Sequence, residues 1–185
     1  MLTTTACDLL RSLGSPSGSP RVSAEQQIAR SAPRDATAEE VTIYLPRLFA
    51  DGTLGLQGVP RPIDADRDPA WEVLQALIRG PDGEERAADF QYALDRRTRA
   101  LGVRVEGGTG TIEFGEGLER VHGRPFSELV YWSIVYTMTE VPGVDRVALT
   151  HEGRRLATLG SPPFDVPSVA SRAEAPSWAR PRREP

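Results

Sequence analysis

The sequence predicts a small domain of the mixed α/β (α+β) class, with a sheet of about four to five strands and two helices packed on it. Short β-branched or alternating segments occur at 41–45, 101–105, 112–114 and 144–150. Two other segments, 69–79 and 126–140, carry apolar residues at helical spacing. Because strands and helices are interspersed along the chain, we expect one mixed sheet and not separate helical and sheet regions.

The first predicted strand is Val41–Leu45, which is β-branched and aromatic and is closed by Pro46. Its composition predicts that both faces are partly covered. A glycine-rich crossing, 51–58, leads to a second extended segment, 59–63. Because Pro60 and Pro62 cannot donate a backbone hydrogen bond, we expect this segment to be an edge strand or extended coil that pairs weakly.

The first predicted helix runs from Pro69 to Arg79. Asp68 can cap its N-terminus, Pro69 suits the first helical position, and Gly80 followed by a proline provides a stop. One apolar stripe is available to pack on the sheet: Trp71, Leu74 and Ile78, with Ala70 and Leu77 beside them.

A β-hairpin is predicted next, because alternating apolar residues at 101–105 and 112–114 flank Gly107–Gly108. Segment 126–140 is apolar nearly all round, which predicts the central helix. A turn at 142–143 leads to a strand at 144–150, and 152–153 offers a tight turn toward Leu156. Two helices on one face leave the other sheet face without cover, which favours assembly with a partner.

Composition excludes several classes of protein. The 185 residues carry a net charge of -4, and no stretch gathers arginines on one face, so nucleic acid is not an expected partner. Cys7 is the single cysteine, which excludes an intrachain disulfide and a four-cysteine zinc site. No window approaches the roughly 18 apolar residues of a membrane-spanning helix.

The two ends are predicted to lie outside the folded domain, which the sequence places at 41–160. Residues 1–40 read as a signal remnant and flexible tether, because 14–20 alternates glycine, serine and proline. Ala6–Cys7 ends like a bacterial lipoprotein signal, which predicts lipidation of Cys7; the alternative is a lone thiol near the terminus. Residues 161–185, rich in proline and arginine, are predicted to be a disordered tail.

Taken together, these residues resemble the GerMN domain of sporulation and spore germination proteins, over about 41–158. The most specific stretch is a helix that ends in Thr-x-Thr-Glu at 137–140 and is followed by Pro142–Gly143–Val144. The remaining matches are spread along the domain: Val41–Leu45, Arg61, Pro69, Leu74, Leu77, Gly80–Pro81, Gly102–Val105, Ile112–Phe114, Val147 and Glu152–Gly153.

The resemblance implies an extracytoplasmic, often lipid-anchored domain without known catalysis, similar to ring-building modules that pack side by side in envelope complexes. It implies no cofactor. Its expected partners are envelope proteins or further copies of itself, with membrane attachment if Cys7 is acylated.

The sequence contains no complete motif for phosphate binding, metal binding or catalysis. Gly107–Gly110 lacks the P-loop lysine and lies between two strands, so it reads as a turn. His122 and His151 lie in separate loops without ligands at metal spacing. Glu113, Glu116 and Glu119 give no paired geometry, and Ser127 and Ser133 lack the glycines of a nucleophile elbow. We therefore predict no catalytic residue and no metal site.

The sequence leads to a first hypothesis, a non-catalytic scaffold or interaction module of the cell envelope. Trp132 and Tyr136 lie four residues apart on one helix face, which suggests a partner interface; the alternative is that both side chains fill the core. The rival hypothesis is a protein that binds a small ligand or peptidoglycan fragment, with or without weak hydrolase activity, in a cleft between the 51–58 loop and the hairpin. A third hypothesis, which applies if Cys7 is not a lipid site, is a cytoplasmic regulator.

Overall fold

The computed structural model describes residues 38–64, 66–118 and 123–182, and Cys7, Glu119 and His122 lie outside these ranges. The described residues contain two sheets with three helices beside them, which confirms the α+β class. A third, minor sheet of two short strands lies near the C-terminus. In the described part of the chain, no helix has the length and hydropathy needed to cross a membrane.

A long antiparallel hairpin forms the first layer, made of β1 (Ala38–Leu48) and β2 (Leu54–Asp64), which pair along their whole length. This corrects the weak pairing expected of 59–63. Tyr44, across from Gly58, directs its backbone N–H outward to a helix. Pro60 and Pro62 lie two and four residues after Gly58, so a backbone N–H at either position would also point away from the partner strand. Because such an N–H makes no bond within the hairpin, proline does not weaken the pairing there.

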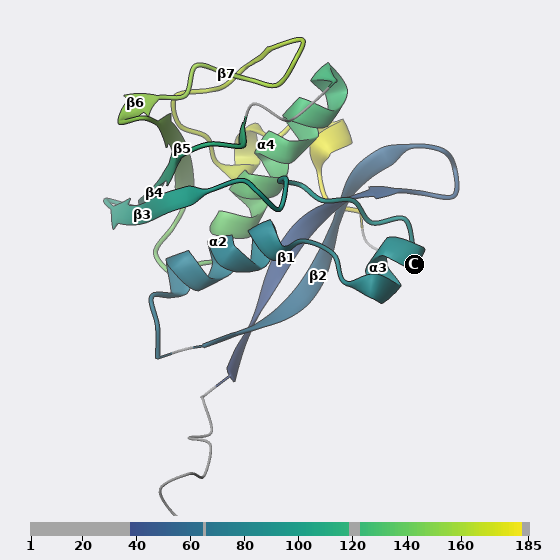
Figure 1. Ribbon diagram of the computed structural model, residues 1–185, viewed down its shortest axis with the longest axis horizontal. Helices are drawn as coiled ribbons and strands as arrows, with labels where there is room; N and C mark the ends of the chain where they lie inside the picture. Colours follow the sequence, from purple (N-terminus) through teal and green to yellow (C-terminus); the bar gives the residue numbers. More distant parts are fainter. Residues whose placement is uncertain (1–37, 65, 119–122, 183–185) are drawn as a thin grey trace, which may run out of the picture. The chain divides into compact units, whose positions relative to one another are not determined.

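The second layer is a sheet of four strands in the order β3–β4–β5–β6, separate from the hairpin. Its strands are β3 (Ala100–Glu106), β4 (Thr109–Phe114), β5 (Arg146–His151) and β6 (Arg154–Arg155). The hairpin predicted at 101–114 is β3 and β4, and β4 pairs with β5 in parallel. The single sheet expected from the sequence is thus two sheets (Figure 1).

Helix α2 (Pro69–Arg79) has the predicted bounds. The side chain of Asp68 accepts a hydrogen bond from the backbone N–H of Ala70 at 2.9 Å, and Gly80 ends the helix at φ 68°. Helix α3 (Gly83–Ala87), which was not predicted, is a single short turn with a capping box between Asp82 and Glu85.

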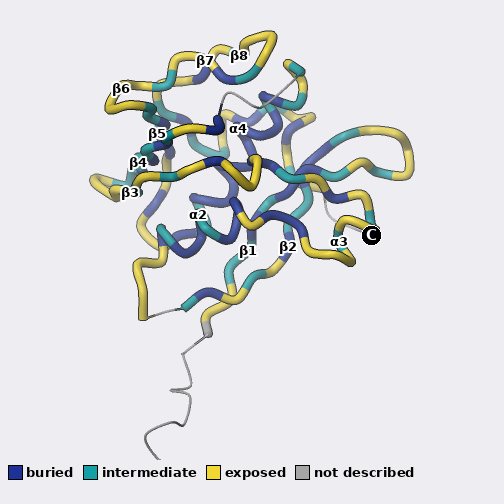
Figure 2. The backbone as a smooth tube through the Cα atoms, in the orientation of Figure 1, coloured by how far each residue is buried: buried dark blue, intermediate teal, exposed yellow. Residues whose placement is uncertain are grey.

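Helix α4 (Arg124–Met138) is the central helix, as predicted, and begins and ends two residues earlier than the predicted 126–140. Every residue from Leu129 to Met138 is buried. Figure 2 shows this helix as a largely dark-blue segment between the hairpin, the sheet and the C-terminal segment. A helix that is apolar all round requires cover on all sides, and these three regions provide it.

The C-terminal segment 161–182, here named the C-terminal strap, is ordered and packed on the domain, so the predicted disordered tail is wrong for these residues. After β7 (Thr158–Leu159), it contains β8 (Phe164–Asp165) and two 3-10 helices, η2 (Arg172–Glu174) and η3 (Ser177–Ala179). Its apolar anchors are mostly small and irregularly spaced, which explains why no period appears in the sequence: Val166, Ala170, Ala175 and Ala179.

Candidate interaction site

The described residues cover the four-stranded sheet on one face only. Along β4, Ile112 and Phe114 are buried, whereas the alternate residues Thr111 and Glu113 are partly exposed. We name this second face the open face. It forms a shallow hollow lined mainly by polar or small residues of β3, β4 and β5: Gly102, Arg104, Glu106, Thr111, Glu113 and Thr150.

Strand β3 is the edge of this sheet and pairs only with β4 within the described residues. Two of its apolar side chains remain exposed, Leu101 at 52% and Val105 at 42%. Val105 lies opposite Gly110, so it belongs to the covered side of the sheet, but its cover is incomplete. An edge strand with unpaired backbone groups and exposed apolar side chains is a template for pairing with another chain.

The charges beside this edge are solvated but ordered. Hydrogen bonding from the Thr150 hydroxyl, and then from the Gly153 N–H, holds the pKa of Glu113 below its usual value. The Gly153 N–H donates to Glu113 Oε1 at 2.8 Å. Arg104 and Glu106 form an ion pair of 3.6 Å, with both side chains largely exposed. The open face therefore carries both signs of charge and favours no single kind of ion.

The Thr-x-Thr-Glu motif at the end of α4 has a structural role. Thr137 Oγ1 accepts a hydrogen bond from the Tyr44 N–H of β1 at 2.9 Å, and Glu140 Oε1 accepts one from the Tyr44 hydroxyl at 2.9 Å. Arg172 of the strap donates to Thr139 Oγ1 at 2.6 Å and to Glu140. The motif thus joins the first strand, the central helix and the strap at one point.

Arg172 could not be identified from the sequence. Its guanidinium lies over the rings of Tyr44 and Tyr136, 5.5 and 5.4 Å from their centroids, and donates to the Tyr136 carbonyl at 2.6 Å. Burial, with the hydrogen bond to Glu140, raises the pKa of Tyr44 to about 12. No local signal marks this arginine, because its partners lie far away in the chain.

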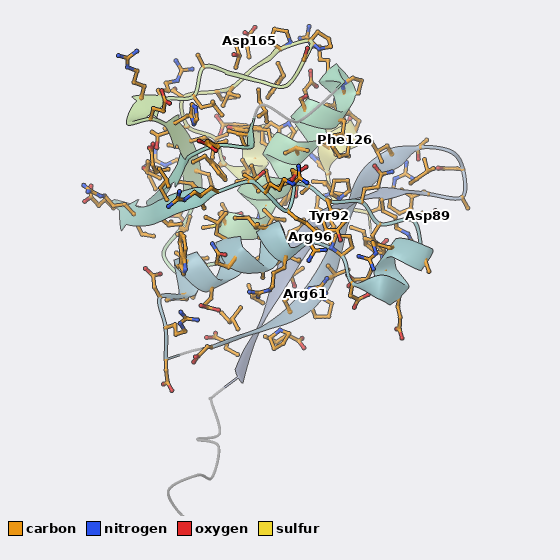
Figure 3. The ribbon with its side chains drawn as sticks, viewed as in Figure 1. Arg61, Asp89, Tyr92, Arg96, Phe126 and Asp165 are labelled. Carbon is orange, nitrogen blue, oxygen red and sulfur yellow. The ribbon has the colours of Figure 1, made fainter. Side chains whose placement is uncertain are left out.

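Arg61 and Gly80, which also belong to the family resemblance, form a second structural cluster. Arg61 donates to both carboxylate oxygens of Glu85, with 2.7 Å to Oε1, and to the carbonyl of Gly80 at 3.3 Å. Arg61 lies where β2 passes α2 and α3 (Figure 3). A Cβ on Gly80 would overlap the ring of Tyr92, so the site requires glycine for space and for its positive φ.

The predicted interface residues Trp132 and Tyr136 are buried, with 5% and 7% of their surface exposed. They therefore fill the core, and the interface prediction for them is wrong. The sequence could not reveal this, because the strap that packs on α4 lies about thirty residues downstream and has no apolar period. Cys7, the predicted lipidation site, lies outside the described residues.

The candidate nucleophiles and ligands have structural partners. The Ser127 hydroxyl donates to the Gly123 carbonyl at 3.0 Å, and the Ser133 hydroxyl donates to the carbonyl of Tyr44. His151 Nδ1 contacts the carbonyl of Phe114 at 3.0 Å, which fixes that nitrogen as the donor. Within the described residues, no group of three histidine, cysteine or carboxylate side chains could hold a metal ion.

The rival hypothesis places a cleft between the 51–58 loop and the β3–β4 hairpin. Residues 51–58 belong to the turn and second strand of the first hairpin. A cavity of about 360 Å³ lies at the end of β5, where apolar and polar side chains meet. Its lining residues are Leu118, His151, Leu156, Thr158, Leu159, Gly160 and Ser161.

The fold and site define a small α+β domain with an exposed sheet edge and, among its described residues, no cluster of potential metal ligands. The sequence matches the Germane family, described as sporulation and spore germination, over residues 33–157. The chain therefore belongs to the Germane (GerMN) family. The C-terminal strap lies beyond the matched residues.

Solved structures with the same fold support this assignment. The first GerMN domain of the sporulation protein GerM from Bacillus subtilis is 19% identical, with a TM-score of 0.56, covering 72% of this chain and 99% of that one. The tandem GerMN domains of GerM give 18% identity and a TM-score of 0.57, covering 74% of this chain and 47% of that one.

A third structure, described as a candidate lipoprotein from Clostridium perfringens, is 15% identical, with a TM-score of 0.53. The match covers 78% of this chain and 95% of that one. At these identities, the likeness to all three structures establishes the fold. No curated protein sequence matches the chain significantly.

Proposed function

We propose that this chain is a non-catalytic interaction module of the bacterial cell envelope. The observation that carries the proposal is the free edge of β3, where Leu101 and Val105 stay exposed beside the open face. A monomer that functioned alone would gain stability by covering these side chains, whereas a docking strand of a partner would cover them and complete the ladder.

The partner in this proposal is another envelope protein, or a second copy of the chain, that adds a strand to β3. Arg104 and Glu106 alternate with the apolar residues on this strand and keep it soluble when it is unpaired. Because the ion pair is exposed, it contributes little to stability and can exchange partners when a second strand docks.

A photo-crosslinking amino acid at position 105 in the full chain, expressed in its host, tests this proposal. We expect a discrete adduct that mass spectrometry identifies as an envelope protein or as a dimer of the chain. The matched control places the same amino acid at Trp178, which is 47% exposed on the strap, away from β3. Equal adducts at both positions, or none at position 105, would contradict the proposal.

The proposed location is extracytoplasmic, with the membrane attachment supplied by a lipid on Cys7. The fold shared with a candidate lipoprotein supports this location, as does membership of a sporulation and germination family. Metabolic labelling with a palmitate analogue is expected to label the chain and not Cys7→Ala. The chain for this experiment includes any upstream start, and the absence of label from the unsubstituted chain would exclude the anchor.

The second candidate function is the binding of a small ligand, such as a peptidoglycan fragment, in the cavity at His151. Its volume of about 360 Å³ falls in the usual range for ligand sites, and it combines leucines with polar groups. Soluble muramyl peptides would then raise the melting temperature in a saturable manner, and His151→Ala would remove that effect. The absence of a saturable shift would exclude this candidate.

A further inference from the structure

Over about half of β1, the backbone groups of its outer edge form hydrogen bonds with other parts of the same chain. The backbone of Tyr44 bonds to the two hydroxyls of α4 described above. Two residues further along, the carbonyl of Pro46 accepts from the Gln91 N–H at 2.8 Å, and the Leu48 N–H donates to the Asp89 carbonyl at 3.1 Å. From Tyr44 onward, this edge therefore has partners.

The outer edge of β2 is closed in a different way. The Arg182 N–H donates to the carbonyl of Leu56 at 2.8 Å, so the end of the strap adds a short bridge to this edge. Farther along, Pro60 and Pro62 face outward and have no N–H to offer. Prolines at outward positions are a common protection against pairing with a foreign strand.

Among the described residues, neither kind of protection is present at the beginning of β1. Glu40 and Thr42 have the same ladder phase as Tyr44, so their backbone N–H and C=O groups face outward. None of the described residues forms a hydrogen bond with these groups. The start of β1 is therefore unpaired, whereas the other parts of the hairpin edges are bonded to other described segments or carry prolines.

A hollow of about 160 Å³ adjoins this stretch. Its floor is apolar, with Val41 and Ile63 from the hairpin, Val73 from α2 and Val141 from the turn after α4. An added strand would direct every second side chain to one face, so an apolar residue could enter the hollow while its neighbours faced away from it.

The charge around the hollow is negative. Glu39, Glu40 and Glu140 contribute to its lining, and Glu140 is already paired with Arg172. Glu39 and Glu40 have no ion-pair partner within the described residues. The two carboxylates would attract a cationic segment and would repel an acidic one.

We infer that the start of β1 binds an extended, basic peptide segment of another protein, which adds as a strand at Glu40 and Thr42. The main-chain bonds supply the docking geometry, the hollow accepts an apolar side chain, and the two carboxylates select arginine or lysine beside it. This site is separate from the β3 edge of the proposed function and does not depend on it.

Fluorescence anisotropy with the full chain and a labelled Arg-Val-Arg-Val-Arg peptide tests this inference. Thr42→Pro removes the outward N–H, and proline is compatible with this position because Pro46 points the same way on the same strand. Thr42→Val is the control, since it keeps both the N–H and the shape of the side chain. We expect Thr42→Pro to weaken binding about tenfold, which corresponds to the loss of one buried hydrogen bond, and Thr42→Val to leave it within about twofold.

Two further experiments test the role of the carboxylates of Glu39 and Glu40. The paired substitution Glu39→Gln and Glu40→Gln should weaken binding about fivefold and reduce its dependence on salt. A Glu-Val-Glu-Val-Glu peptide should not bind. Equal binding of the acidic and basic peptides would overturn the inference, as would no binding of the basic peptide.

A measurement on the unsubstituted chain covers the possibility that Thr42→Pro does not fold. Hydrogen exchange at the Thr42 amide should slow about tenfold when the basic peptide is bound, because that N–H becomes part of a ladder. Unchanged exchange would overturn the inference. Val105→Lys should not alter peptide binding, so failure at β1 and failure of the β3 proposal are distinguishable.

Discussion

The β1–β2 hairpin and the four-stranded sheet use the same kind of strand for different purposes. The hairpin is buried on both faces toward its turn, where Leu45 and Pro46 are consecutive buried residues, as are Gly55 and Leu56. The sheet is covered on one face, and its β3 edge is exposed. Burial on both faces makes this part of the hairpin a structural element, whereas burial on one side leaves the sheet with a surface that a partner can contact.

The residues that match the family also distinguish the hairpin, as a structural element, from the exposed β3 edge. Thr137 and Glu140 hold β1, and Arg61 holds β2 against α2 and α3, so these matching residues fix the hairpin. The matching stretch in β3, Gly102–Val105, forms no such side-chain bond to a distant element within the described residues, and its Val105 stays 42% exposed. A family signature of this kind identifies the fold but leaves the partner undefined.

The largest effect is expected from removal of the C-terminal strap. A chain that ends at Gly160 loses the cover of α4 that includes Val166 and Ala170, and exposes Trp132 and Tyr136. The free energy of unfolding should fall by at least about 4 kcal/mol, a large part of the stability of an ordinary domain. Urea denaturation measures this loss. A control chain that ends at Arg182 should unfold like the full chain, and a fully stable truncated chain would show that the strap is dispensable.

Gly80→Ala should be the next most harmful change. The added Cβ would overlap the Tyr92 ring at a φ of 68°, and α2 would lose its termination beside Arg61. A destabilisation of about 2–3 kcal/mol follows from strain of this kind. Gly83→Ala is the matched control, because its Cβ would meet only Arg86, at 3.9 Å. Thermal unfolding of both variants makes the comparison, and equal melting temperatures would argue against a special role for Gly80.

Arg172→Gln should cost about 1–2 kcal/mol, because it removes charge-assisted hydrogen bonds to Glu140 and Thr139 that are only partly shielded from solvent. Arg104→Gln is the control, since Arg104 is 76% exposed and its one ion pair is long. Chemical denaturation should separate the two variants by more than the error of the measurement. Similar stability would mean that the strap is held by its apolar anchors alone.

Alkaline pH should destabilise the hairpin through ionisation of Tyr44 in β1. The pKa of Tyr44 is raised from 10.0 to about 12, first by burial and then by its bond to Glu140. A raised pKa in the folded state contributes stability that is fully present below pH 10.0 and is lost as the pH rises toward about 12. Absorbance of the ionised phenol, followed beside far-UV circular dichroism, tests this prediction. In Tyr44→Phe the loss above pH 10 should be smaller.

The smallest effect on stability is expected at β3. Val105→Lys places a charge on a side chain that is already 42% exposed, so the free energy of unfolding should change by no more than about 0.5 kcal/mol. The same change should prevent association at this edge. Denaturation curves, and the crosslinking yield from a photo-crosslinking amino acid placed at position 101 of the same strand, are measured on one preparation. A large loss of stability would place β3 among the structural elements, together with the hairpin.

The sequence by itself determined the local elements. Asp68, Pro69 and Gly80 are start and stop signals that act within a few residues of α2, so its bounds could be predicted. The glycines at 107–108 and the alternation around them determined the β3–β4 hairpin in the same way. The Thr-x-Thr-Glu stretch, together with the matches spread over about 41–158, indicated the family, which the match over residues 33–157 then established.

Only the tertiary structure decided how these elements meet. It separated β1 and β2 from the sheet, placed the prolines of β2 on the outward side of the ladder, and buried Trp132 and Tyr136 under a strap predicted to be disordered. Each of these outcomes depends on contacts between residues far apart in the chain. Local propensity cannot reveal such contacts, because a small alanine in a proline-rich segment becomes a core residue only when a distant helix provides the surface that covers it.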